Sequence, residues 1–174
     1  MPMMRTGISI FDNTDLNINT PLMYGGGILN QDHAVNVIRQ GAERISVDQV
    51  ISSDIDNLLQ ISSAIGSQAV VAALPLKIIN DQLCHYDYIH DESINLLSSS
   101  IVDKVNADCF SELMIIDVVG EGGCQGFNMS IFSNSCQIFN HPLLPFGGFS
   151  TANHINNYLS NDSVSGTRSL GTSL

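Results

Sequence analysis

Two glycine pairs, Gly26-Gly27 and Gly147-Gly148, occupy matching positions in two similar stretches of this chain of 174 residues. The stretches read PLMYGGGILNQDHAVN from Pro21 and PLLPFGGFSTANHINN from Pro142. Glycine in such a turn lets backbone N–H groups approach an anion at the N-terminus of a following helix. The repeat therefore predicts two phosphate sites on one face of the protein. The alternative is that the glycines only permit the chain to turn.

The elements that hold these turns read as a strand, a glycine turn and a helix, which is the unit of an α/β fold. Repetition of the unit at a long offset predicts a duplicated β/α architecture. Strands are expected at residues 21–24, 44–47, 69–74, 113–118, 143–146 and 164–169, and Ile8–Phe11 is the one strand candidate before them. Helices are expected at 31–40, from a cap at Ser52 or Ser53 to Gly66, and at 93–106, 129–139 and 151–159. Asn80-Asp81 indicates a hairpin, and short strand–helix connections favour a parallel sheet.

Length and charge restrict the class of protein. We expect a single domain over residues 1–174 with an atypical segment at 1–19, shorter than the roughly 200 to 250 residues of a complete eight-stranded barrel. A net charge of -11 with only 6 Lys and Arg disfavours nucleic acid and acidic membrane surfaces as partners. The four cysteines lack CxxC spacing, and no apolar run has membrane-spanning length. These features favour a cytoplasmic protein with reduced thiols.

Five stretches in order carry a resemblance to a known family: PLMYGGGI, GAERISV, GSQAVVAAL, the GFN after a glycine-rich loop, and PLLPFGGFS. The chain resembles the cyclase subunit of imidazole glycerol phosphate synthase, a lyase of histidine biosynthesis, and GSQAVV is the most specific stretch. The resemblance covers about residues 20 to 174 and implies strands three to eight of a (β/α)8 TIM barrel, an incomplete barrel. It also implies ring closure with ammonia from a glutaminase partner on the opposite barrel face. The sister isomerase of the pathway is an alternative that the hairpin disfavours.

The resemblance implies a phosphorylated small-molecule substrate held at both ends, with no cofactor and no metal. Gly25, Gly26 and Gly27 match the first phosphate site. Gly147 and Gly148 match the second, to which Gly166 and Thr167 would add a contribution from strand eight.

The sequence departs from the family at the catalytic positions. The family's strand-five aspartate, one of a general acid–base pair, is replaced by Pro75, which has no titratable group. The strand-one aspartate has no clear counterpart, so Asp12, Asp117 and Glu121 are the candidates for a restored catalytic acid. Asp48 stands where the family has asparagine, and a carboxylate there repels phosphate.

These departures leave three hypotheses for function. The chain is a cyclase whose acid comes from elsewhere, a non-catalytic phosphate-binding or scaffold homologue, or a barrel fragment that self-associates through open strand edges.

Other polar residues have simpler interpretations. His85 and Asp87 share one face of the hairpin near His90 and Asp91, a pattern that could bind a metal, but a solvated hairpin is favoured. His33 and His154 begin equivalent helices and are expected to cap or pack. No sequence feature supplies a base to a nucleophile at Cys124, and Ser46, Ser67 and Ser150 lack the context of a nucleophile elbow.

Overall fold

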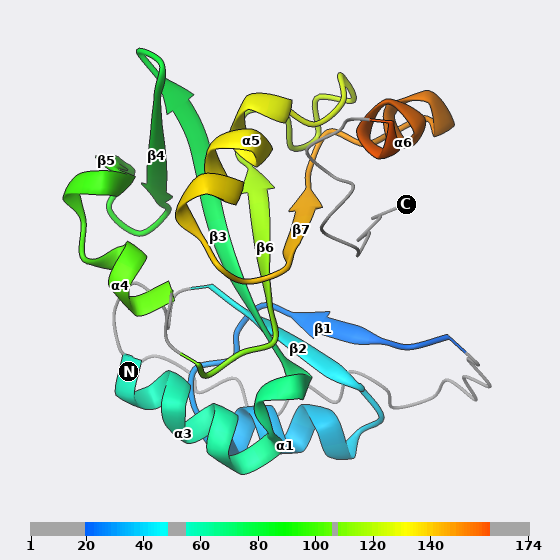
Figure 1. Cartoon of the computed structure of the whole chain (residues 1–174). Helices are drawn as coiled ribbons and strands as arrows, with labels where there is room; N and C mark the ends of the chain where they lie inside the picture. The colour runs from blue at the N-terminus through cyan, green and yellow to red at the C-terminus, as the bar shows by residue number, and fades with distance from the viewer. Residues whose placement is uncertain (1–19, 49–54, 106–107, 161–174) are drawn as a thin grey trace, which may run out of the picture.

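The computed structural model describes residues 20–48, 55–105 and 108–160 (Figure 1). The strands predicted at 8–11 and 164–169 lie outside these ranges, as do Asp12, Gly166 and Thr167. Within them, no helix is long and apolar enough to cross a membrane.

Five parallel strands form the centre of the structure. They are β1 (Met23–Gly25), β2 (Arg44–Val47), β3 (Val70–Ile79), β6 (Glu112–Asp117) and β7 (Leu143–Phe146). They pair in the order β1-β2-β3-β6-β7, and the outer sides of β1 and β7 have no strand partner within the described residues. The predicted strands are confirmed at these places, and two of them, 44–47 and 143–146, have the predicted bounds.

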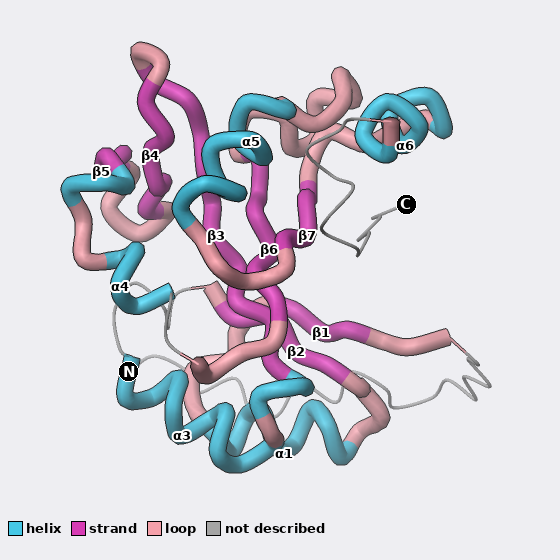
Figure 2. Tube along the Cα trace, in the orientation of Figure 1, coloured by secondary structure: helices cyan, strands magenta, loops and turns pink. Residues whose placement is uncertain are grey.

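Helices connect the parallel strands, as Figure 2 shows. They are α1 (Gln31–Arg39), α3 (Ile55–Ile65), the short α4 (Ile101–Val105), α5 (Met129–Ile138) and α6 (Ala152–Leu159), with 3-10 turns η1 (Ser67–Ala69) and η2 (Leu96–Ser98). α1 packs against α3, and α5 lies across β3, β6 and β7 (Figure 1). The alternation of strand and helix makes this an α/β fold of the (β/α)8-barrel type, present here as an incomplete barrel.

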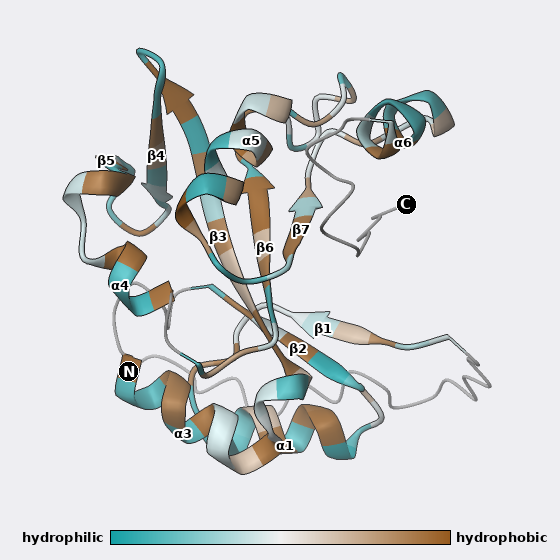
Figure 3. Cartoon of the chain, viewed as in Figure 1, coloured by the Kyte–Doolittle hydropathy of each residue, from teal (hydrophilic) through white to brown (hydrophobic). Residues whose placement is uncertain are grey.

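The sheet is apolar on both faces. Ala72, Leu74 and Leu76 of β3 belong to the main buried cluster, which also includes residues of the helices. Val71 and Ala73 point the other way and form a second cluster with Met114, Leu144 and their neighbours. Figure 3 accordingly shows the strands at the centre of the sheet as mainly hydrophobic. A continuous apolar run is what a strand buried on both faces requires, which is why β3 was recognisable in the sequence.

β3 extends beyond the parallel sheet into the predicted hairpin. Residues Val71–Leu76 pair with β6, and Leu76–Ile79 pair antiparallel with β4 (Gln82–Asp87). Asn80 and Asp81 have φ of 50° and 62°, the left-handed values that a two-residue hairpin turn requires. The Asn-Asp hairpin is confirmed.

The helix predicted at 93–106 is wrong over most of its length. Glu92–Asn95 is a strand, β5, that pairs antiparallel with β4, and helix follows only as η2 and the five-residue α4. Ser and Asn side chains compete with helical hydrogen bonds, and Asn95 does so here by accepting the N–H of Leu97 at 3.0 Å. The cross-strand partner of residues 92–95 is not visible in a local pattern.

Candidate functional site

The carboxyl ends of the parallel strands bring most of the predicted site residues to one edge of the sheet. Gly25 ends β1, Asp48 follows β2, Asp117 ends β6, and Gly147 follows β7. Pro75 lies in the same region and is paired with Ile116 of β6. This is the edge at which barrel enzymes carry their chemistry.

The two glycine turns have the same backbone geometry. Gly26 and Gly27 have φ of 104° and 69°, and Gly147 and Gly148 have φ of 104° and 76°. Each turn leads to a helix whose cap side chain accepts the N–H of a histidine three residues on. The pairs are Asn30 with His33, at 2.9 Å, and Thr151 with His154, at 3.3 Å. The repeat seen in the sequence is therefore a repeat of structure, and His33 and His154 start their helices as expected.

The turns differ in what surrounds them. Among the described residues, no atom would lie within 4 Å of a Cβ added at Gly26 or Gly27, apart from the chain neighbours. A Cβ at Gly148 would collide with the carbonyl oxygen of Gly126, and one at Gly147 would lie 3.0 Å from the carbonyl oxygen of Asp117. The second turn thus packs on the loop after β6, whereas the first is open to a ligand.

Asp117 is a buried organiser of the loop after β6. Only 3 % of this residue is exposed to solvent. The Oδ1 atom accepts the N–H groups of Val119 at 3.1 Å and Gly120 at 2.9 Å, and Oδ2 accepts that of Asn128 at 3.0 Å. This arrangement supports a structural role, because the carboxylate is occupied by backbone donors.

Glu121, in contrast, is exposed and reaches the hairpin. Burial raises the pKa of Tyr88, and the charges of Glu121, Tyr86 and Asp48 raise it further. The charge of Glu121, in the loop after β6, therefore acts on the segment that follows β4, near the carboxyl ends of the parallel strands.

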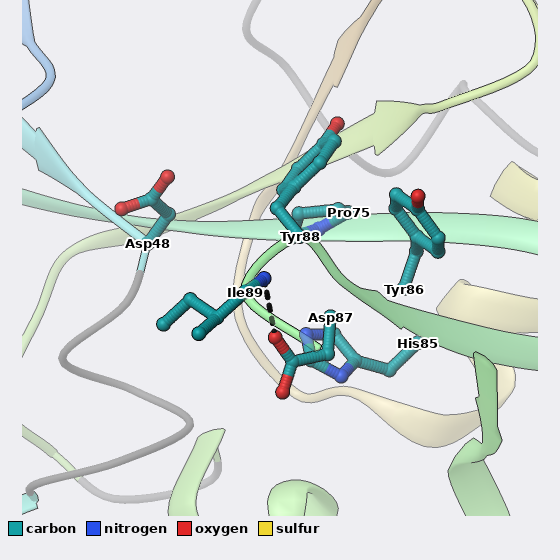
Figure 4. Close-up of a pocket in the computed structure, with 7 residues that line it drawn as sticks. All are labelled: Asp48, Pro75, His85, Tyr86, Asp87, Tyr88 and Ile89. Atoms are coloured by element: carbon teal, nitrogen blue, oxygen red, sulfur yellow. Dashed lines mark hydrogen bonds between the residues drawn. The ribbon is translucent and has the colours of Figure 1, made fainter. Parts of the chain in front are cut away.

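A small pocket opens beside Pro75 (Figure 4). Its lining consists of Asp48, Pro75, His85, Tyr86, Asp87, Tyr88 and Ile89. β2 pairs with β3 up to Ala72, and β4 pairs with it from Leu76 onward, on the side of β3 away from β6 (Figure 1). Pro75 lies in the gap between these two pairings, where its missing N–H leaves no donor unpaired.

His85 is a residue of this pocket that the sequence did not single out as buried. It is only 5 % exposed, and its Nδ1 atom is buried without a hydrogen-bond partner among the described residues. Burial lowers the pKa of His85, and the charge of Asp87 partly opposes that shift. The imidazole is therefore held neutral near pH 7, with an acceptor nitrogen available.

The neighbouring hairpin histidine has a different environment. The Nδ1 atom of His90 lies 2.8 Å from Oδ2 of Asp87, whose Oδ1 accepts the N–H groups of Ile89 and His90. Across residues 20–48, 55–105 and 108–160, no three His, Cys, Asp or Glu side chains are grouped so as to hold a metal ion.

Comparison with known proteins places the chain in a family. A family model described as "Histidine biosynthesis protein" matches residues 5–167. The imidazole glycerol phosphate synthase subunit HisF of an Exiguobacterium species is 24% identical over 151 residues, covering 87% of this chain and 59% of the relative. A putative HisF2 subunit of Campylobacter jejuni is 30% identical over 136 residues, covering 75% and 52%. HisF of Sulfolobus acidocaldarius is 28% identical over 150 residues, covering 83% and 58%.

The chain spans between half and three fifths of the length of these relatives. The matched region includes both glycine turns, the Pro75 pocket and the loop organised by Asp117. With the model matching most of its length, this chain belongs to the family of histidine biosynthesis proteins.

Proposed function

We propose that this chain binds a phosphorylated small molecule through the first glycine turn and lacks the ring-closing chemistry of the cyclase subunits it resembles. The open geometry of Gly26 and Gly27 carries the proposal. Both residues have positive φ and are exposed in the described part of the chain, and α1 begins four residues later with its N-terminus toward the turn. Backbone N–H groups and the positive end of a helix together attract a phosphate.

The second glycine turn, Gly147-Gly148, gives weaker support for phosphate binding. Gly147 and Gly148 pack against Asp117 and Gly126, and the Gly126 N–H donates to the Gly148 carbonyl at 2.9 Å. Those contacts account for glycine at both positions without a ligand. A second phosphate at this turn, with help from Gly166 and Thr167, is a subsidiary proposal.

Loss of catalysis is proposed from the chemistry of three positions. Pro75 cannot transfer a proton, and Asp117 is buried among three backbone donors. Glu121 is the described acid best placed to act, because it is exposed at the carboxyl edge. Its charge, however, acts on Tyr88 and helps to raise the pKa of that hydroxyl. A missing general acid or base costs roughly 10² to 10⁴ in rate.

Thermal melts with and without glycerol 3-phosphate test the binding proposal. We expect a saturable rise in Tm that glycerol does not give, since only the phosphate ester carries the anion. The variant Gly26→Ala should lose the rise. Its matched control is Gly41→Ala, because Gly41 has φ of 108°, equally open surroundings and a position at the far end of α1. Equal ligand responses in both variants would refute the assignment.

The cyclase itself is the second candidate, favoured by the family match and by the position of Glu121. Turnover of the bisphosphate substrate with ammonium salts separates the two candidates. We expect no turnover from a sample that melts cooperatively. Measurable turnover that is lost in Glu121→Gln would favour the cyclase.

A glutaminase partner is proposed to dock at the amino ends of the strands, opposite the pocket. Arg44 and Glu112, at the starts of β2 and β6, form an ion pair there with N···O of 2.5 Å, and Arg44 also donates to Ser111 at 2.7 Å. Mixing this chain with the glutaminase subunit of imidazole glycerol phosphate synthase should give co-elution that Arg44→Glu weakens. Separate elution of the two proteins contradicts docking.

Self-association is proposed through the outer sides of β1 and β7, because unpaired strand edges recruit further strands. Light scattering on the purified chain should give a mass above 18.8 kDa, and a monomer at micromolar concentration would contradict this.

The free thiols of Cys84, Cys109, Cys124 and Cys136 support a cytoplasmic location.

A further inference from the structure

We infer that the Pro75 pocket binds a small organic cation through its ammonium head group, with Asp48 and Asp87 supplying charge and His85 Nδ1 accepting a hydrogen bond. The inference concerns a different site from the glycine turns and does not depend on phosphate binding there.

The position of the pocket follows from strand pairing. β2 ends beside β3 after Val47, and β4 returns along the same side of β3 to end at Asp87. The side chains that follow these two ends, Asp48 and the segment Asp87–Ile89, therefore face each other across Pro75 (Figure 4). On this side of β3, Pro75 has no strand partner among the described residues, and the pocket there has room for a group of a few atoms.

The charges around the pocket disfavour an anion. Asp48 and Asp87 both line it, and the charge of Glu121 acts on Tyr88, which lines it too. Two cationic groups lie nearby: Lys77 has its ammonium over the Tyr86 ring at 4.2 Å from the ring centre, and His90 is paired with Asp87 when it is protonated. Carboxylates from two different strands repel phosphate but attract an ammonium group.

His85 is the independent sign of a ligand. His85 lines the pocket, and its Nδ1 atom is buried without a hydrogen-bond partner among the described residues. In the tautomer that carries its proton on Nε2, this atom is an acceptor, and leaving a buried acceptor unsatisfied is unfavourable. An N–H donor satisfies it, and an ammonium group has three such donors. Phosphate, which has acceptors in excess, does not suit this atom.

The aromatic side chains suit a cation as well. Tyr86 and Tyr88 are in edge-to-face contact, with ring centroids 4.9 Å apart, and both line the pocket. Aromatic faces attract organic cations, and Tyr86 already does so with Lys77. A bare metal ion is a poorer occupant, because the described residues bring no three metal ligands together.

NMR of the whole chain labelled with ¹⁵N-histidine tests the inference directly. The probe is ethylammonium chloride, compared with sodium chloride at the same ionic strength and with ethanol. We expect a saturable change in the His85 side-chain resonance with ethylammonium alone, while His33 and His154 stay unchanged. Equal changes with sodium chloride or ethanol, or no saturable change, would overturn the inference.

Matched variants locate the charge that binds the probe. Asp48→Asn should raise the Kd for ethylammonium by about tenfold, the effect of one well-placed charge. Asp56→Asn, which removes the same charge from the exposed surface of α3, should leave the Kd unchanged. Equal effects of the two variants would mean that the net charge of -11 attracts the probe without a site, and would overturn the inference. The titration of the unmodified chain decides the case if Asp48→Asn does not fold.

Independence from the phosphate proposal is testable in the same experiment. Ethylammonium has no phosphate, so Gly26→Ala should leave its binding intact. Loss of ethylammonium binding in a folded Gly26→Ala protein would contradict the existence of two separate sites.

Discussion

The Oδ2 atom of Asp117 accepts the backbone N–H of Asn128 at 3.0 Å, which closes the loop after β6 onto the start of α5. The other carboxylate oxygen binds the N–H groups of Val119 and Gly120. A side chain proposed from sequence as a catalytic acid therefore has contacts that fit a structural anchor.

Replacing Asp117 by Asn should lower the free energy of unfolding by about 2–3 kcal/mol, because an amide nitrogen would face a backbone donor in a buried position. Urea denaturation measures the loss. Asp103→Asn, on the exposed surface of α4, is the control and should be nearly neutral. Equal midpoints for the two variants would contradict the anchoring role.

The two glycine turns should respond differently to alanine. Gly26→Ala incurs only the strain of positive φ, about 1–2 kcal/mol. Gly148→Ala adds a collision with the Gly126 carbonyl and should cost about 3 kcal/mol or more. Thermal or urea denaturation compares them. A Gly148→Ala protein as stable as Gly26→Ala would show that the second turn is not packed as described.

The contrast between these turns shows which features of the structure can be predicted from the sequence and which cannot. The repeat of PLMYGGG and PLLPFGG predicted the strands, the positive-φ glycines and the helix starts, because each depends on local residue types. The packing of Gly148 on Gly126 depends on a loop more than twenty residues away, and no local pattern encodes it.

Tyr158 should limit stability at alkaline pH. It is 1 % exposed, its hydroxyl has no partner among the described residues, and burial together with the nearby Cys136 raises its pKa to about 12. The unfolded chain loses this proton near the ordinary value of 10.0, so its contribution to stability is intact below pH 10 and is lost as pH rises toward 12.

Tyr158→Phe should therefore flatten the fall in stability across that pH window. Near pH 7 it should be neutral or gain up to about 1 kcal/mol, because it removes an unpaired hydroxyl from the core. Urea midpoints from pH 7 to 11 measure both effects. A Tyr158→Phe protein that still follows the steep alkaline fall would contradict the prediction.

His90 and Asp87 should titrate as a pair. The hydrogen bond and charge of Asp87 raise the pKa of His90, and the bond to His90 lowers the pKa of Asp87. The stabilisation of the folded protein that comes from protonated His90 is complete below its ordinary pKa of 6.5 and is lost as pH rises through the raised pKa. The stabilisation that comes from ionised Asp87 is present above its ordinary pKa of 3.8 and is lost as pH falls through the lowered pKa.

NMR titration of the His90 ring measures its pKa directly. We expect a value above 6.5 that returns toward 6.5 in Asp87→Asn. The effect on global stability should be small, since the His90 side chain is exposed. An unchanged His90 titration in the folded variant would exclude the pairing.

The site was less predictable than the fold. The glycine turns, Pro75 and Asp48 were identified from the sequence because each is tied to the end of a strand. His85 was interpreted as part of a solvated hairpin, since its burial depends on where β4 lies beside β3. The three backbone donors around Asp117 likewise come from a loop that the pattern did not resolve.

The most direct test of phosphate binding at the first turn is an NMR titration of the backbone amides with glycerol 3-phosphate, with glycerol as the reference. We predict saturable shifts of the Gly26 and Gly27 amides that glycerol does not produce. Titration without saturable shifts at these two amides, or with shifts confined to other parts of the chain, would contradict phosphate binding at this turn.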